Sequence, residues 1–231
     1  MSTNQANKLS KIELFSELSG KTLDNIERRC SWRSFESQEQ IIGWQSETRD
    51  VYFIVTGKVR VVNFSLSGRE VAFDEITAGG YFGETAAIDS EPRSATVVSL
   101  ENTTVAIMSP EAFHALIIEH PNIALTLMVR MAAIIRTSNE RIMDLSTLGA
   151  NNRVYAEIIR LARDSFKDNT AKIKPIPIHG DIASRVSTTR ETVARALNDL
   201  VRKGLVKREN DTLHILDMRH LSEMVEQFKM E

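Results

Sequence analysis

The chain has 231 residues, 42% of them hydrophobic and 26% charged, the balance of a globular protein with room for two modest cores. Its single cysteine, Cys30, excludes a disulfide framework and a thiolate-ligated iron–sulfur cluster, which needs about four ligands. Residues 1–149 carry 14 Lys and Arg against 19 Asp and Glu, whereas residues 150–231 carry 15 against 12, so the second part is the candidate for binding a polyanion. No apolar run has membrane-spanning length and the N-terminus lacks the apolar core of a signal peptide, so we expect a cytoplasmic protein without a membrane partner.

The first part of the chain is predicted to be rich in strands. After a short helix expected over residues 22–30, runs of β-branched and aromatic residues alternate with glycine-containing turns up to residue 108. The clearest runs are residues 51–55, 59–64 and 103–107. Many short strands with regular turns predict an all-β barrel or roll. Ser109 and Pro110 then fit the N-cap and first turn of a helix.

A long helix is predicted from Pro121 to Leu145, because apolar residues recur at alternating spacings of three and four, as in a helix that pairs with another helix. This apolar seam consists of Met128, Met131, Ile135, Ser138, Ile142 and Leu145. Ser138 is its polar break, and Thr137 and Asn139 lie beside it. The break indicates a contact with a polar group; alternatively, the helix packs on its own domain and Ser138 fixes the register.

The apolar period lapses at Gly149, which we interpret as a hinge before a second domain that begins near Ala150. Within that domain, residues 182–186, 187–189 and 190–200 predict two helices around a tight turn. The buried stripe of the second helix is predicted to be Val193, Leu197, Leu200 and Val201. Its opposite face carries Glu191, Arg195, Asn198 and Arg202.

Such a helix reads bases in the major groove with residues near its N-terminus, where arginine suits guanine and a carboxylate suits cytosine. An alternative is that Thr188 and Glu191 form a capping box, in which Glu191 would bind its own backbone. A hairpin predicted over residues 204–215 forms a wing, and its Lys207 and Arg208 can meet phosphates.

The glycine-rich residues 79–87, followed by residues 92–97, predict a phosphate cradle. Glycines let the backbone approach a ligand, and a short helix starting near Gly83 would aim free N–H groups at an anion. Arg93 adds a planar fork for two phosphate oxygens, and Glu84 could accept a hydrogen bond from a sugar hydroxyl. Together they indicate a nucleotide with a singly charged phosphate and a free ribose hydroxyl. Taken separately, residues 79–80 could form a hairpin turn, and Glu84 with Arg93 an ordinary ion pair.

These motifs resemble the cyclic-nucleotide-binding domains and, among them, the bacterial cyclic-AMP receptor (catabolite activator) proteins, over nearly the whole chain. The resemblance implies an α+β protein with three parts. These are a jelly-roll-like β-roll sensor domain at residues 1–120, a dimerisation helix and hinge at residues 121–148, and a winged helix-turn-helix domain at residues 149–231.

The resemblance also implies the residues of the sites. Segments 82–84 and 92–96 are similar to the family's phosphate-binding cassette, which implies Glu84 on the ribose 2′-hydroxyl, and Arg93 with the Ser94 backbone on the cyclic phosphate. The expected cassette residues are Phe82, Gly83, Glu84, Thr85, Arg93 and Ser94.

The family's Thr-Ser pair at the purine is matched either by Thr137 and Ser138 or by Ser138 and Asn139. We prefer the second register, because it lays the apolar seam on the family's dimer seam. In the second domain, the resemblance implies Arg190, Glu191 and Arg195 as readers of a TGTGA-type half-site.

We therefore predict a homodimeric transcription regulator. Its expected partners are cyclic AMP, with cyclic GMP as a second candidate, a palindromic operator in double-stranded DNA, and RNA polymerase. No enzymatic activity, metal or further cofactor is expected, because no side chains have the spacing that a nucleophile, an acid–base pair or a metal needs. The alternatives are the same fold sensing haem, redox state or another small molecule with a vestigial cassette, a kinase regulatory subunit, and a nucleotide-processing enzyme.

Overall fold

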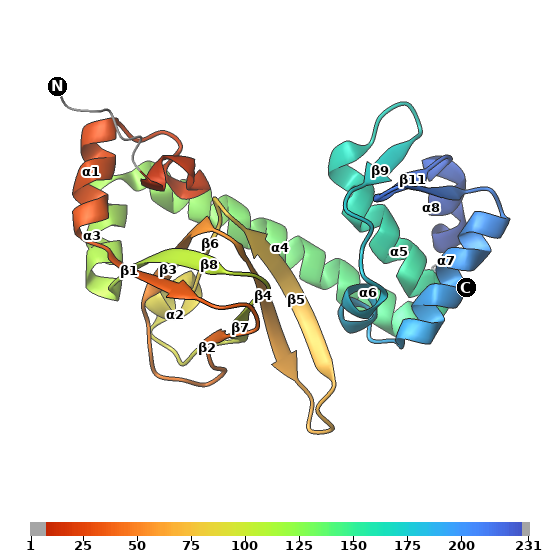
Figure 1. The fold of residues 1–231 in the computed structure, drawn as a ribbon, viewed down its shortest axis with the longest axis horizontal. Coiled ribbons are helices and arrows are strands. Elements are labelled where there is room, and N and C mark those ends of the chain that lie inside the picture. The colour runs from red at the N-terminus through yellow and green to blue at the C-terminus, as the bar shows by residue number, and fades with distance from the viewer. Residues whose placement is uncertain (1–7, 228–231) are drawn as a thin grey trace. The chain divides into compact units, whose positions relative to one another are not determined.

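The structure, a computed structural model, describes residues 8–227 (Figure 1). The chain divides into two compact units, Met1–Ala132 and Ala133–Glu231, so the boundary falls within one helix. Our domain boundaries at residues 120 and 148 stay a prediction.

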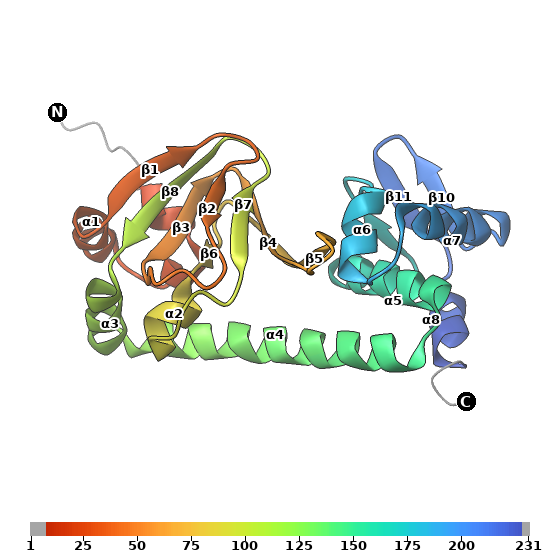
Figure 2. The same ribbon diagram turned by 90° about the horizontal axis from the view of Figure 1, so that it is seen from below.

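The first unit consists of two four-stranded antiparallel sheets and the helices that cover them (Figure 2). One sheet has the order β1-β8-β3-β6 and the other β2-β7-β4-β5. The strands are β1 (Ser31–Phe35), β2 (Gln40–Ile42), β3 (Val51–Thr56), β4 (Lys58–Phe64), β5 (Glu70–Thr77), β6 (Tyr81–Phe82), β7 (Thr96–Ser99) and β8 (Thr103–Met108). The helices are η1 (Lys8–Lys11), η2 (Glu13–Phe15), α1 (Gly20–Arg28), α2 (Glu84–Asp89), α3 (Pro110–Glu119) and the start of α4 (Pro121–Thr147).

This arrangement confirms the predicted β-roll, and the three expected strands correspond to β3, β4 and β8. Ile54, Val59 and Val105 belong to a core formed by strands of both sheets. A second core joins the roll to the helices and includes Phe53 and Phe113. The predicted N-cap is also confirmed, because the Ser109 side chain accepts a hydrogen bond from the Ala112 N–H at 3.3 Å.

The second unit contains the C-terminal part of α4, further helices and a small antiparallel sheet of order β10-β11-β9. Its remaining elements are α5 (Ala150–Ala162), η3 (Arg163–Ser165), β9 (Ala171–Ile173), α6 (His179–Arg185), α7 (Arg190–Arg202), β10 (Val206–Glu209), β11 (Thr212–Ile215) and α8 (Met218–Glu226). The helix pair α6–α7 followed by the β10–β11 hairpin is the predicted winged helix-turn-helix. The break before α5 is also where we placed it, since Gly149 is the extended N-cap residue of α5.

One predicted residue of the buried stripe of α7 is exposed, and the alternative role of Glu191 is not observed. Val201 is 42% exposed, and Ala196 takes its place in the buried stripe. The reason is geometric: at about 100° per residue, position 201 has rotated roughly 80° away from Val193 and faces solvent in the last turn. The alternative of a capping box formed by Thr188 and Glu191 is wrong. The N-cap is Thr189, whose hydroxyl accepts from the Thr192 N–H at 3.2 Å, so Glu191 occupies the second helical position and not the third.

A buried group of charges, which we call the Glu157 cluster, joins α4, α5 and α6 within the second unit. Glu157 is 0% exposed and pairs with Arg141 at 3.3 Å, with Arg185 at 3.5 Å and closely with Arg160. Arg160 also pairs with Asp144 at 2.7 Å. A buried carboxylate needs such partners, because an uncompensated charge in a protein interior is costly.

Over residues 8–227, no single helix has both the length and the apolar composition to cross a membrane. Helices α3 and α4 satisfy these criteria only as a pair, and they are bent by 110° relative to each other.

Candidate functional site

The predicted cradle begins where β6 ends. Phe82 is held by stacking on Tyr52, with ring centroids 4.9 Å apart and planes 4° from parallel. Gly83 follows with φ +84° and caps α2. A Cβ at this position would lie 2.8 Å from both the Arg93 Nη1 atom and the Asp50 carbonyl oxygen, so only glycine fits without displacing Arg93.

Arg93 is buried against this turn and is held by uncharged oxygens only. Its Nε donates to the Thr48 hydroxyl at 3.1 Å, its Nη1 to the Gly83 carbonyl at 2.8 Å, and its Nη2 to the Asp50 carbonyl at 2.8 Å. The alternative of an ion pair between Glu84 and Arg93 is therefore wrong. A guanidinium has five N–H groups, so two remain for an incoming anion, and within residues 8–227 no carboxylate forms an ion pair with Arg93.

Glu84, the first residue of α2, is 8% exposed, and burial raises the pKa of its carboxyl group. Its own backbone N–H, Arg130 and Arg93 act in the opposite direction on this pKa. Among the hydrogen bonds and ion pairs between described side chains, none involves Glu84. The carboxyl group is thus a buried acceptor beside the Arg93 cradle, the combination that a ribose hydroxyl next to a phosphate requires.

Sequence reasoning missed two residues beside this cradle. The Tyr81 hydroxyl is buried and has no hydrogen-bond partner among the described residues. The Arg130 guanidinium, from α4, lies 4.2 Å from the centroid of the Tyr81 ring, within the range of a cation–π interaction. Tyr81 and Arg130 are far apart in the sequence, and no local sequence pattern predicts their contact.

The remaining residues predicted to bind the nucleotide are more exposed. Thr85 and Ser94 point to solvent, and the Ser94 carbonyl accepts a hydrogen bond from the Asn63 amide at 3.2 Å. Thr137 is half-buried, whereas Ser138 and Asn139 are exposed. These three lie on the part of α4 that belongs to the second unit, so only the cassette residues are brought together in the first unit.

The apolar seam of α4 is left uncovered in the single chain. Met128, Ile135, Ile142 and Leu145 are between 46% and 59% exposed. The alternative of a helix that packs its seam on its own domain is therefore wrong for these four residues. A row of exposed apolar side chains on one helix favours contact with another surface.

The predicted DNA-reading residues lie at the solvent-facing start of α7. Arg190, Glu191 and Arg195 are exposed, and the carboxylate of Glu191 is 3.8 Å from the Arg195 guanidinium. Gly180 in α6 makes room for Arg190, because a Cβ there would lie 3.0 Å from the Arg190 Nε. The surface of α7 thus offers two cations and one carboxylate to a groove.

The wing residues are exposed as well. Lys207 pairs with Glu209 at 3.3 Å, and Arg208 lies 3.5 Å from the His179 ring. Burial lowers the pKa of His179, and the Arg208 charge lowers it further. Both wing cations can therefore reach a polyanion.

Arg153 of α5, which sequence reasoning did not single out as a functional residue, braces the turn between α6 and α7. It donates to the Val186 carbonyl at 2.9 Å, the Ser187 carbonyl at 3.2 Å and the Leu148 carbonyl at 2.9 Å. Ser187 has φ +51°, the left-handed conformation that a tight turn needs. These bonds hold the turn before α7 against the start of α5.

Known proteins share both halves of this architecture. The family model of the cyclic nucleotide-binding domain matches residues 32–120, and that of the Crp-like helix-turn-helix domain matches residues 152–224. The cyclic AMP receptor protein of Thermus thermophilus is 30% identical over 174 residues, 75% of this chain and 78% of the relative.

Two solved structures have the same fold. A mutant of CooA from Carboxydothermus hydrogenoformans has a TM-score of 0.79 at 21% identity, covering 97% of this chain and 98% of that chain. The c-di-GMP responsive global regulator CLP of Xanthomonas campestris has a TM-score of 0.67 at 16% identity, covering 85% of this chain and 99% of that chain.

A cyclic nucleotide-binding domain followed by a helix-turn-helix domain defines a ligand-responsive transcription regulator. The chain belongs to the CRP/FNR family of these regulators. The members of this family are DNA-binding regulators and not enzymes.

Proposed function

We propose that the protein is a homodimeric transcription regulator that binds a purine cyclic mononucleotide in the β-roll and a TGTGA-type palindrome through α7. The observation that carries the proposal is the Arg93 guanidinium, which is buried among uncharged oxygens and keeps two N–H groups for a phosphate. Glu84 supplies the acceptor for the ribose 2′-hydroxyl. A ligand with one negative charge and one free ribose hydroxyl satisfies both residues.

The identity of the purine rests on α4. The cyclic AMP receptor protein is named for its ligand, which supports cyclic AMP as the effector here. Ser138 and Asn139 offer a hydroxyl and an amide, which can pair with either purine edge. Ser94 offers a further hydroxyl beside the phosphate for a guanine amino group. We therefore expect cyclic AMP and cyclic GMP to bind with comparable affinity.

The dimer is proposed to form along the seam of α4, because its apolar residues are exposed and follow the heptad spacing. A two-fold symmetric dimer would present its two recognition helices to half-sites about 34 Å apart. Contact with RNA polymerase and a cytoplasmic location follow from the activity of such a regulator and are proposed with it.

Calorimetric titration with cyclic AMP, cyclic GMP and cyclic di-GMP tests the effector. The regulator CLP is described as responsive to c-di-GMP, so this ligand is the discriminating third arm. Each titration is repeated with operator DNA. Because binding linkage is reciprocal, DNA must raise the affinity for the true effector by the same factor by which that effector raises the affinity for DNA.

Binding of cyclic di-GMP alone would refute the mononucleotide proposal. More than about a hundredfold preference for one mononucleotide without DNA, a gap of about 2.7 kcal/mol, would refute the comparable affinities. If DNA changes the affinity for no ligand, the protein is not a ligand-controlled switch. An absorption spectrum with a Soret band in the purified protein would favour the haem-sensing alternative.

A further inference from the structure

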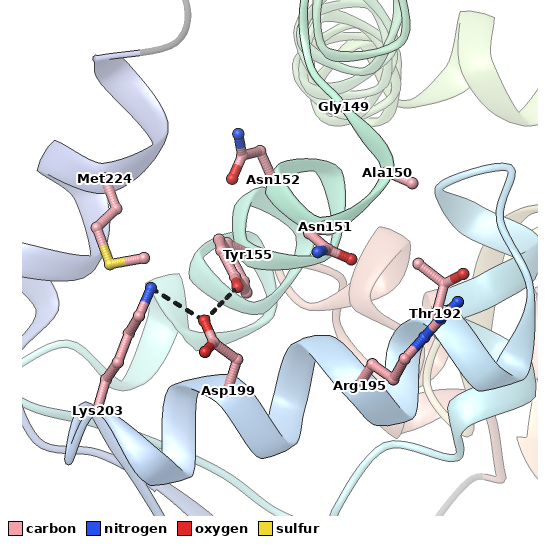
Figure 3. A pocket seen from close by; sticks show the side chains of 10 residues that line it. All are labelled: Gly149, Ala150, Asn151, Asn152, Tyr155, Thr192, Arg195, Asp199, Lys203 and Met224. Carbon is pink, nitrogen blue, oxygen red and sulfur yellow. Dashed lines mark hydrogen bonds and ion pairs between the residues drawn. The ribbon is translucent and has the colours of Figure 1, made fainter.

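Tyr155 on α5 makes a polar contact with α7. Its ring is buried in the core of the second unit, and its hydroxyl donates to the Asp199 Oδ2 atom at 3.0 Å (Figure 3). Burial and then the hydrogen bond to Asp199 raise the pKa of Tyr155 to about 12, so the hydroxyl remains a donor at neutral pH.

Asp199 has two further partners on its own helix, and both are exposed cations. Lys203 lies 2.9 Å from Oδ2 and Arg202 lies 2.6 Å from Oδ1. The bonds from Lys203, Arg202 and Tyr155 lower the pKa of Asp199 to about 2, so the carboxylate is charged. Exposed ion pairs on a helix surface are weak and exchange with water, whereas the buried Tyr155 hydroxyl is fixed in place.

Asp199 lies four residues after Arg195, the arginine expected to read a base. Residues four apart on a helix are neighbours, and an arginine and a carboxylate at this spacing attract each other. Both side chains line the same open pocket of about 710 Å³, together with Thr192; in Figure 3 Asp199 points to Tyr155 and Arg195 points toward Thr192. In the structure Arg195 is not bonded to Asp199; its side chain is 67% exposed and lies 3.8 Å from Glu191.

We propose that Tyr155 is a specificity-determining positioning residue: by occupying Asp199, its hydroxyl keeps Arg195 from folding back along α7 and leaves it free to contact a base. The inference rests on the proposed function, since it requires Arg195 to read DNA. Without the hydroxyl, Asp199 keeps only the donors of Lys203 and Arg202, so a third donor can take the place that Tyr155 held. Arg195 lines the same pocket one helical turn away, and its contact with Glu191, at 3.8 Å between exposed side chains, is weak enough to be exchanged.

The test uses Tyr155→Phe, which keeps the ring and removes the donor. Binding is measured by fluorescence anisotropy at one salt concentration with two DNA duplexes. One is a TGTGA palindrome, and the other is the same palindrome changed at the base pair where Arg195→Ala loses discrimination. We expect Tyr155→Phe to lower the ratio of the two affinities by about tenfold, within the range for one bidentate arginine contact. Affinity for unrelated DNA should stay unchanged.

A second substitution separates this mechanism from a general structural effect. Asp199→Ala removes the carboxylate that would capture Arg195, so the double variant Tyr155→Phe, Asp199→Ala should regain most of the wild-type ratio. If Tyr155 only stabilised the fold, the double variant would be no better than Tyr155→Phe. Ile158→Val, a change in the same buried face of α5, is the matched control for lost stability and should retain the ratio.

The outcomes are distinguishable. A folded Tyr155→Phe protein with the wild-type ratio, a double variant without recovery, or an equal loss in Ile158→Val would each overturn the role of Tyr155 while leaving the proposed function intact. A wild-type protein that does not discriminate between the two palindromes would overturn the proposed base reading, and the role of Tyr155 with it.

Discussion

Replacing Glu157 by glutamine removes the negative charge at the centre of the Glu157 cluster with almost no change in side-chain volume. Breaking a buried ion pair from one side costs about 3–5 kcal/mol, because the remaining charge is left in the interior. Arg160 keeps Asp144 at 2.7 Å, and the contacts of Arg141 and Arg185 with Glu157, at 3.3 and 3.5 Å, are the longer ones. We therefore expect a loss near the lower end, about 3 kcal/mol in the free energy of unfolding of the second unit.

The two units can be followed separately in this experiment. Both tryptophans, Trp32 and Trp44, lie in the first unit, so urea unfolding followed by tryptophan fluorescence reports that unit. Hydrogen exchange of the α5 amides reports the second unit. Glu140→Gln is the matched control, because Glu140 is 39% exposed and pairs with the same Arg160, and its change should cost less than about 1 kcal/mol. A Glu157→Gln protein with wild-type exchange in α5 would refute the reasoning.

Three further outcomes are expected. Arg93→Ala should lose about 2 kcal/mol or more of cyclic-nucleotide binding free energy in calorimetry, because a charge-assisted contact to phosphate disappears; unchanged affinity in the folded variant would contradict the cradle. In gel-shift titrations Arg195→Ala should cost about 1–3 kcal/mol on the palindrome and relax one base pair, whereas Lys207→Ala should weaken all sequences alike and lower the salt slope; identical behaviour would refute the assignment. The pKa of Asp199 is lowered to about 2, chiefly by Lys203, so its contribution to stability is complete above about pH 4 and disappears as the pH falls towards 2. In acid unfolding, the stability of Asp199→Asn should therefore converge with that of the wild type as the pH falls through this range. A difference in stability that stays constant over the range would contradict this prediction.

Much of the fold was predictable, because local patterns and final structure agree. Runs of β-branched and aromatic residues between turns became β3, β4 and β8, and Ser109 caps α3 as its sequence position indicates. In α7 the predicted buried stripe failed at Val201, and the capping-box alternative was displaced by one residue. The N-cap is Thr189 and not its neighbour Thr188, since two adjacent threonines suit the same role and the tertiary position of the turn decides between them.

The candidate site was predictable only in part. The glycine turn and Arg93 form a recognisable local motif, but Thr48 and Asp50, which aim the guanidinium, come from a loop more than forty residues earlier. The contact of Arg130 with Tyr81 depends likewise on how α4 packs on the roll. Packing between distant segments leaves no periodic or compositional trace in either segment, so such partners emerge only from the structure.

The proposed switch has to operate through α4, because this helix contributes to both units. Its first turns bury Ile123 and Leu127 in the core of the first unit, whereas Arg141 and Asp144 near its end belong to the Glu157 cluster. A ligand shifts an equilibrium only by its difference in affinity between two states, and allosteric coupling energies are typically about 1–3 kcal/mol. Separating Glu157 from its partners, which leaves buried charges without compensation, costs about 3 kcal/mol and is of the same order. Rearranging the cluster would therefore absorb most of the coupling energy, which favours a switch in which α4 and α5 remain joined and move together.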